Sequence, residues 1–139
     1  ERQTRMGDVI KTGTVINSDP SMELIDNIFF PNSPLHDGAL IIREGRLCAA
    51  GCFLPLSENF EISRELGTRH RAALGLSEVS DAVVIVVSEE TGVITVAKNG
   101  KLKRNYTKDM LKQELKAEIL GETENGMPEK KRTFWKVKK

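Results

Sequence analysis

The feature that most limits what this chain can fold into is an unbroken run of β-branched residues, Val83 to Val87, which follows Ala82. A strand with one face in water alternates apolar and polar residues, but this run contains no polar position. The pattern therefore predicts a central strand over residues 82–87 that is covered on both faces. A chain that contains such a strand must place other elements on both sides of a sheet.

The bulk composition is that of one folded domain. The 139 residues suffice for a hydrophobic core, and 39% apolar with 29% charged residues is far from a disordered composition. The net charge of +1 gives no overall attraction to nucleic acid, and only 5% of the residues are aromatic. These values argue against a nucleic-acid-binding module. The sequence shows neither a transmembrane stretch nor a signal peptide.

The two cysteines, Cys48 and Cys52, are four residues apart in an apolar stretch. In an extended strand they point to the same face but lie too far apart for a disulfide. This spacing is not that of a Cys-x-x-Cys metal motif, and no second cysteine pair completes a zinc site. We interpret them as buried, reduced thiols, which fits a cytoplasmic protein.

Apolar spacing and turn residues predict the other elements. The predicted strands are 14–16, 39–42, 47–53, 93–97 and an edge strand that ends at 103, with hairpin turns at Glu44-Gly45 and Asn99-Gly100. A first helix is predicted from Asp19 as N-cap and Pro20 as first helical residue, with an apolar face of Leu24, Ile25, Ile28 and Phe29. A second helix is predicted over 67–76, and residues 77–78 either end it or continue it by one more turn. A last helix is predicted from Thr107 to a stop at Gly121, with Leu111, Leu115 and Ile119 on one face. Residues 59–66 are predicted to be a loop with a short helical turn.

The composition changes after Gly121. Residues 122–128 resemble a linker, and Lys and Arg residues then surround Phe134 and Trp135. We predict a domain over 1–121 and a basic, flexible tail over 122–139. Contact of this tail with an anionic membrane surface is a weaker alternative.

Asp37-Gly38 directly precedes the predicted strand at 39–42. One interpretation is a simple turn, because Asp-Gly is a common turn dipeptide. The other is a site in which the Asp37 carboxylate binds a divalent metal and Gly38 lets a ligand approach the backbone. His36 is a further metal ligand in this interpretation, although a lone histidine is more often a hydrogen-bonded neighbour. Both interpretations stay open at this point.

A second polar cluster, Gly67 to Arg71, opens a predicted helix. A helix N-terminus suits an anion, and the Thr68 hydroxyl and Arg69 guanidinium are typical additions for phosphate. Arginine at this position opposes the helix dipole, a cost that a bound phosphate would offset. The alternative is that the arginines pair with carboxylates of the chain, for which the candidates are Glu61, Glu65 and Glu78. The residues alone leave the two interpretations equal.

Ser88 to Gly92 follow the predicted central strand. Ligands of open α/β sheets bind beyond the carboxyl ends of the strands, so Ser88 and the carboxylates of Glu89 and Glu90 stand where a site is expected. The alternative is a polar turn.

These clusters resemble the two signature motifs of the bacterial diadenylate cyclase domain, the DisA N-terminal family. The motifs are DGA at 37–39 and RHR at 69–71. Longer strings, in the order and spacing of the membrane-anchored subfamily, strengthen the resemblance: PNSPLHDGA at 31–39, LPLS at 54–57, ELGTRHRAALG at 65–75 and VSEETG at 87–92. The resemblance covers about residues 6–120, and an ordered set of this length is specific.

The resemblance implies a fold, a reaction and partners. The fold is α/β, with a mixed central β-sheet flanked by helices. The reaction joins two ATP molecules into cyclic di-AMP with release of two pyrophosphates, needs Mg²⁺ or Mn²⁺, and takes place between two domains that meet face to face as a homodimer. A catalytically silent adenine-nucleotide sensor of the same fold is the alternative.

The resemblance also assigns roles to residues of this chain. The catalytic residues are Asp37, which serves the metal and helps to activate the ribose 3′-hydroxyl, and Thr68 and Arg69, which hold phosphates. The residues that bind ATP are Gly38, Ala39, Phe53, Leu54, Gly67, Thr68, Arg69, His70, Arg71, Ser88 and Glu90, with His70 and Arg71 as supports of the phosphate loop. The metal ligands are Asp37, His36 and Glu90.

Two features of the family are missing from the sequence. Family domains begin with a helix and an apolar strand upstream of the position of Glu1, and the anchored members carry transmembrane helices further upstream. We therefore expect a truncated cytoplasmic domain whose parent protein is anchored in the membrane only through that segment. Loss of the upstream strand is expected to expose a sheet edge or part of the core.

Overall fold

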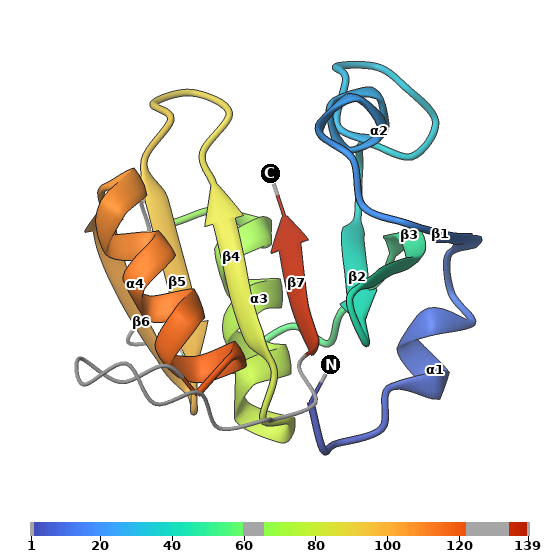
Figure 1. The fold of residues 1–139 in the computed structure, drawn as a ribbon. Coiled ribbons are helices and arrows are strands. Elements are labelled where there is room, and N and C mark those ends of the chain that lie inside the picture. The colour runs from blue at the N-terminus through green and yellow to red at the C-terminus, as the bar shows by residue number, and fades with distance from the viewer. Residues whose placement is uncertain (1, 60–65, 122–133, 139) are drawn as a thin grey trace.

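The run of β-branched residues forms β4 (Val83–Val87), which lies inside one seven-stranded sheet of order β1-β3-β2-β7-β4-β5-β6 (Figure 1). The computed structural model describes residues 2–59 and 66–121, and the backbone of 134–138. β4 pairs in parallel with β7 and antiparallel with β5, so the sheet is mixed, as expected. The other strands are β1 (Thr14–Ser18), β2 (Ala39–Arg43), β3 (Arg46–Cys52), β5 (Ile94–Lys98), β6 (Lys101–Tyr106) and β7 (Phe134–Lys138).

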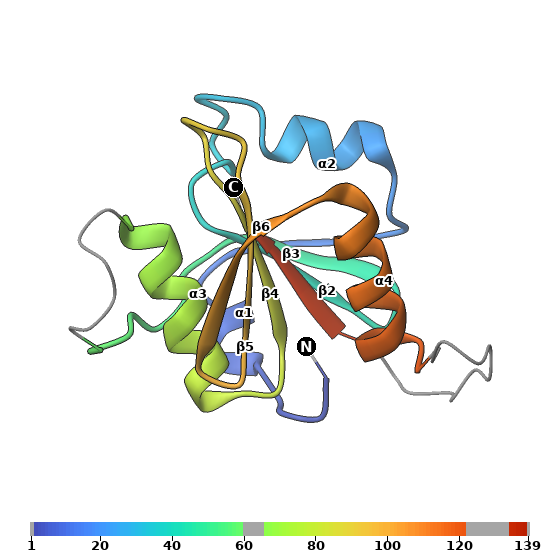
Figure 2. The ribbon, with the colours of Figure 1, turned by 90° about the vertical axis from the view of Figure 1, so that its left-hand side faces the viewer.

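Helices cover both faces of this sheet (Figure 2). The helices are α1 (Gly7–Ile10), α2 (Met22–Ile28), α3 (Thr68–Val79) and α4 (Lys108–Ile119). Residues of α1 and α3 share a core cluster with Ala39 and Ile41, whereas residues of α2 pack against Leu40 and Ile42 from the other face. Successive residues of a strand point to opposite faces, so β2 and β4 need apolar residues at nearly every position. Among the residues that the structure describes, no helix is long and apolar enough to cross a membrane.

Most predicted elements are present, with corrected boundaries. Thr107 caps α4 through its side-chain oxygen, and both hairpin turns have positive φ at the two expected residues, Glu44-Gly45 and Asn99-Gly100. α3 continues by one turn to Val79. β6 runs past the predicted end at 103 to Tyr106, because Tyr106 is buried in a core cluster with side chains of α4. The short helix α1 was not predicted from the sequence.

The predicted start of the first helix is wrong. The N-cap of α2 is Ser21, whose hydroxyl accepts a hydrogen bond from the backbone N–H of Leu24 at 3.1 Å. Asp19 lies outside the helix, where its carboxylate forms an ion pair with the Arg46 guanidinium at 2.7 Å.

Strand β7 differs from the flexible tail that the composition of 122–139 predicts. Its backbone pairs antiparallel with β2 and parallel with β4, so both central strands have neighbours on each side. The residue types Phe134, Trp135 and Val137 favour strands, and the unpaired edges of β2 and β4 would otherwise carry free backbone groups. The predicted boundary at residue 121 therefore does not separate β7 from the sheet. The rest of the predicted tail, 122–133 and 139, and the predicted loop at 60–65 lie outside the described residues.

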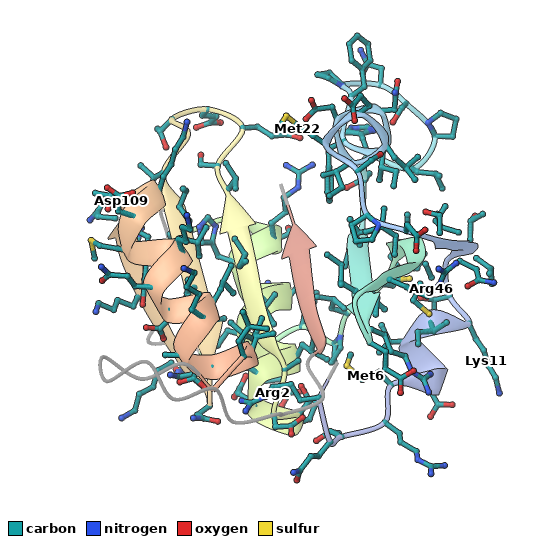
Figure 3. The ribbon with its side chains drawn as sticks, in the orientation of Figure 1. Arg2, Met6, Lys11, Met22, Arg46 and Asp109 are labelled. Carbon is teal, nitrogen blue, oxygen red and sulfur yellow. The ribbon has the colours of Figure 1, made fainter. Side chains whose placement is uncertain are left out.

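The N-terminal segment is held by Asp81, at the end of the sheet where Figure 3 labels Arg2. The Asp81 carboxylate accepts hydrogen bonds from the backbone N–H groups of Gln3 at 2.9 Å and Thr4 at 3.0 Å. Partial burial alone would raise the pKa of Asp81, but these bonds, the Thr4 side chain and the Arg2 charge outweigh it, so the pKa lies below its usual value of 3.8.

A lowered pKa predicts a pH-dependent contribution of Asp81 to stability. The contribution is fully present above the unfolded-state pKa and is lost as the pH falls through the lower native pKa. We expect Asp81→Asn to reduce the free energy of unfolding by about 1 kcal/mol at pH 7, because charge-assisted hydrogen bonds are replaced by weaker ones. The difference from the wild type should shrink below pH 4 in urea unfolding experiments. The exposed carboxylate of Asp26 provides the control Asp26→Asn, and an equal loss there would contradict the assignment.

Candidate active site

A cleft opens at one end of the sheet, where several chain segments converge. Because β2 runs antiparallel to β3 and β7, and β7 runs parallel to β4, the start of β2 lies at the same end as the last residues of β3 and β4. The N-terminus of α3 joins them there. The cleft has a volume of about 720 Å³, within the range of nucleotide-sized ligand sites. Its lining comprises Asp37, Gly38, Cys52, Phe53, Leu54, Leu56, Gly67, Thr68, Arg69, His70, Ala72, Val86, Val87, Ser88, Glu89 and Glu90.

Asp37 stands at the mouth of the cleft, and its side chain is 82% exposed. The next residue, Gly38, has φ +136°, and a Cβ there would lie 2.7 Å from the backbone carbon of Gly51 in β3. A glycine is therefore required at this position by the close approach of two backbone segments, whether or not a ligand is present. Because Asp37 precedes Gly38 directly, the close approach of Gly38 to Gly51 also fixes the position of the Asp37 backbone at the cleft.

Arg69 spans the cleft from the first turn of α3. One guanidinium nitrogen, Nη2, lies 2.9 Å from Oε1 of Glu89 and 3.7 Å from Oδ1 of Asp37. The side chain is 26% exposed, and its Nε is buried without a hydrogen-bond partner among the residues that the structure describes. Of the two interpretations of this arginine, pairing with a carboxylate of the chain is observed, but the partner is Glu89. The predicted partners Glu61 and Glu65 lie outside the described residues.

The N-terminus of α3 forms one wall of the cleft. Its N-cap is Gly67, which offers no side chain to the first turn, and Thr68 at the first helical position is exposed. Backbone N–H groups at the start of a helix carry partial positive charge, so this wall is suited to an anion. His70 is nearly buried behind it, with Nε2 3.4 Å from Oγ1 of Thr95 in β5.

Arg71 does not line the cleft but holds a neighbouring segment in place. Its Nη2 donates to the carbonyl oxygen of Ser57 at 3.2 Å, and the Ser57 N–H donates to the Arg71 carbonyl oxygen at 3.0 Å. The segment so held carries Leu54 and Leu56. These contacts hold the segment at 54–57, whereas the resemblance implied that Arg71 supports the phosphate loop.

Apolar side chains from the segment after β3 form another wall of the cleft. Phe53, which is 69% exposed, Leu54 and Leu56 supply it. The segment packs on α3 so closely that a Cβ at Gly75 would lie 2.0 Å from the Pro55 carbonyl oxygen. A flat apolar wall beside polar groups is what an aromatic base with a charged tail requires.

The turn after β4 brings three polar side chains to the cleft, Ser88, Glu89 and Glu90. The Ser88 hydroxyl accepts a hydrogen bond from the Thr91 N–H at 3.3 Å, and the Gly92 N–H donates to the Ser88 carbonyl oxygen at 2.9 Å, so Ser88 also organises the turn. The sequence placed Glu89 in this cluster, but the family resemblance assigned roles only to Ser88 and Glu90. The need of Arg69 for a carboxylate partner was a usable signal for Glu89.

The structure leaves three predicted residues away from the cleft lining: His36, Ala39 and Arg71. The His36 ring places Nδ1 2.7 Å from the Ser33 carbonyl oxygen, so this nitrogen is occupied by its own loop. Within the described parts of the chain, no three His, Cys, Asp or Glu side chains lie close enough to hold a metal ion. The predicted ligand set Asp37, His36 and Glu90 is therefore not assembled in advance.

Comparison with known proteins identifies the family. The family model of the nucleotide-binding domain of the DisA bacterial checkpoint controller, abbreviated DAC, matches residues 1–102. The chain belongs to the DAC family. The resemblance inferred from the two signature motifs is thereby confirmed.

Relatives of this DAC domain carry names that state an activity. The cyclic di-AMP synthase CdaA of Bacillus subtilis is 53% identical over the whole chain, which covers 50% of that protein. A diadenylate cyclase of Listeria monocytogenes is 50% identical over 86% of the chain, which covers 44% of that protein. The chain thus spans about half the length of these curated relatives.

Solved structures match the fold of the DAC domain. A crystal structure of DacA from Staphylococcus aureus, a double mutant, superposes with a TM-score of 0.83 at 48% identity, over 85% of this chain and 79% of that chain. A Bacillus cereus structure, described as a hypothetical membrane spanning protein, gives 0.73 at 46% identity, over 77% of this chain and 52% of that one. The predicted α/β class with a mixed central sheet is confirmed.

The close approach at Gly75 makes a prediction about stability. Alanine in place of glycine usually stabilises a helix interior by up to about 1 kcal/mol. We expect Gly75→Ala to lower the free energy of unfolding by about 1–2 kcal/mol instead, because the added methyl group would collide with the 55–57 backbone. Gly7→Ala, at a position with nothing within 4 Å, is the matched control and should be neutral in urea unfolding. A stabilising Gly75→Ala would contradict the packing described for this wall.

Proposed function

We propose that this domain is a diadenylate cyclase, which joins two ATP molecules into cyclic di-AMP and releases two pyrophosphates. The observation that carries the proposal is the convergence of both family motifs on one cleft, where Asp37 and Arg69 lie 3.7 Å apart. Relatives named as cyclic di-AMP synthases and diadenylate cyclases support the same activity. Substrate, product and roles below belong to this proposal.

The proposed reaction is two equivalent nucleotidyl transfers. In each, the ribose 3′-hydroxyl of one ATP attacks the α-phosphorus of the other, a P–O bond forms, and the bond to pyrophosphate breaks. The hydroxyl proton leaves to a base or to solvent, so two turnovers of this step give one cyclic product, two pyrophosphates and two protons. Positioning and charge stabilisation supply most of the catalysis in reactions of this type.

The lining of the cleft suggests a place for each part of ATP. The wall of Phe53, Leu54 and Leu56 suits the adenine ring, whereas the start of α3 suits the phosphates. Arg69 would stabilise charge that develops on the α-phosphate, with Thr68 and Ser88 as hydroxyl contacts. The nearly buried His70 would keep the helix turn in place from behind.

The charge of the cleft supports a requirement for a divalent metal ion. Among the described residues, its lining carries the carboxylates of Asp37, Glu89 and Glu90 and one permanent cation, the guanidinium of Arg69. A nucleotide triphosphate brings several more negative charges, so a cation must accompany it. Mg²⁺ is commonly bound by one or two carboxylates together with substrate phosphates, which fits the exposed Asp37 with Glu90 and needs no preformed cage. When bound, Mg²⁺ or Mn²⁺ would lower the charge on the α-phosphate and the pKa of the attacking hydroxyl.

Product analysis tests this proposal directly. We expect purified protein with ATP and Mg²⁺ or Mn²⁺ to produce cyclic di-AMP and pyrophosphate in a 1:2 ratio, measured by mass spectrometry and a pyrophosphate assay. EDTA should abolish the product. Binding of ATP in calorimetry without any product, under both metals, would favour the silent sensor instead.

The variant Asp37→Asn sharpens that test. Because the side chain is largely exposed, the variant should melt within about 1 °C of the wild type, in line with the small effect of most exposed substitutions. Turnover should fall at least about 100-fold, the usual effect of removing a group that acts in the transition state, while ATP affinity weakens much less. Asp26→Asn, which changes an exposed carboxylate of α2 outside the cleft lining, is the control. Unchanged turnover in Asp37→Asn would remove this residue from the mechanism.

The stoichiometry of the reaction supports a face-to-face homodimer. Each cleft carries one Asp37 and one Arg69, whereas the product links two adenosines symmetrically. Two loaded copies must therefore meet with their clefts opposed. The description of the Bacillus cereus neighbour as membrane spanning supports a further proposal, that a longer parent chain anchors this domain on the cytoplasmic face of the membrane.

A dimeric mechanism predicts that specific activity depends on protein concentration. Specific activity should rise with concentration in the nanomolar to micromolar range, because the fraction of paired domains rises. Sedimentation velocity at the same concentrations separates the alternatives. Activity that is independent of concentration in a sample that sediments as a monomer would overturn the dimer; the same activity in a sample that sediments as a dimer would be consistent with tight pairing.

A further inference from the structure

The contact between Arg69 and Glu89 suggests a role for Glu89 that the proposed function does not assign. Glu89 lines the cleft beside Glu90, yet only Glu89 of these two forms an ion pair with Arg69 in the described structure, at 2.9 Å. The inference below rests on the proposed function, since it concerns the site where a nucleotide would bind.

The geometry of Arg69 is that of a guanidinium with an incomplete set of partners. Both carboxylates, Glu89 and Asp37, contact the same nitrogen, Nη2, so neither forms the bidentate fork that arginine favours. The Nε N–H is buried and makes no hydrogen bond within the described part of the chain. A buried donor without a partner is costly, and an anion with several oxygens is able to satisfy it where one carboxylate oxygen does not.

The ion pair with Glu89 is also easy to exchange. The Glu89 side chain is 50% exposed, and half-exposed ion pairs contribute little to stability. A phosphate group that enters the cleft offers Arg69 three oxygens and more charge than a single carboxylate. The carboxylate of Glu89 would then lie close to the phosphate and repel it.

We propose that Glu89 is a stand-in for the nucleotide phosphate. Without a nucleotide, Glu89 forms an ion pair with the Arg69 guanidinium. When a nucleotide binds, its phosphate replaces the Glu89 carboxylate, so that the two compete for the same guanidinium. The residue thereby keeps Arg69 pointed into the cleft between reaction cycles. It also weakens the hold on polyphosphate, which favours the departure of pyrophosphate after each transfer.

The test is nucleotide affinity in a double-mutant cycle. The probe is α,β-methylene ATP, which cannot lose pyrophosphate, and its dissociation constant is measured by calorimetry in EDTA and again in Mg²⁺. We expect Glu89→Gln to bind the probe about five-fold more tightly than the wild type, the scale of an exposed ion pair. In the Arg69→Gln background, Glu89→Gln should change the affinity by less than two-fold, because the competition no longer exists.

In EDTA, where no metal ion involves Glu90, Glu90→Gln is the matched control, since it removes the same charge from the same turn without an ion pair to Arg69. Equal tightening by Glu90→Gln and Glu89→Gln would show a general charge effect and overturn the inference. Weaker binding in Glu89→Gln would also overturn it, because Glu89 would then position Arg69 within the complex. If the wild type itself binds no probe in either condition, the proposed nucleotide site is wrong. Binding by the wild type with an unchanged Glu89→Gln variant would reject the stand-in role alone.

Discussion

The burial of β2 and β4 on both faces is the constraint on which the rest of the structure depends. Each of these strands has apolar residues at almost every position, so polar side chains of these segments are accommodated only at the strand ends. Charged groups such as Asp37 and Glu89 are therefore concentrated where the chain enters β2 or leaves β4. The core and the site are two consequences of the same pattern. A polar substitution in the middle of either strand would damage both at once.

The sequence predicted elements well where a local signal sufficed. The run Val83–Val87, the turn at Asn99-Gly100 and the cap at Thr107 each depend on neighbours in the chain, and each was found in place. Predictions failed for the start of the first helix and for the tail. Ser21, two residues after Asp19, caps α2. Strand β7 pairs with two strands that lie far away in the sequence, and a local pattern does not reveal such partners.

The candidate site shows the same division. The two sequence motifs predicted both sides of the cleft, because Asp37 and Arg69 each belong to a short motif of specific residue types. The partner of Arg69 could not be chosen from the sequence, since Glu89 and Glu90 are adjacent carboxylates in one turn and only the path of the backbone distinguishes them. Gly38 illustrates a further limit. Its conformation and its contact with Gly51 show a packing requirement where the sequence suggested room for a ligand.

The position of β7 links the two sides of the cleft. Among the strands that the structure describes, backbone pairing joins β1, β3 and β2 into one group and β4, β5 and β6 into another, and β7 pairs with both groups (Figure 1). Asp37 precedes β2 of the first group, and Glu89 follows β4 of the second. Because β2 and β4 both pair with β7, these two carboxylates stand at neighbouring ends of one continuous sheet. A shift in the register of β7 against either strand would therefore move the two carboxylates relative to each other and to the Arg69 guanidinium that contacts both.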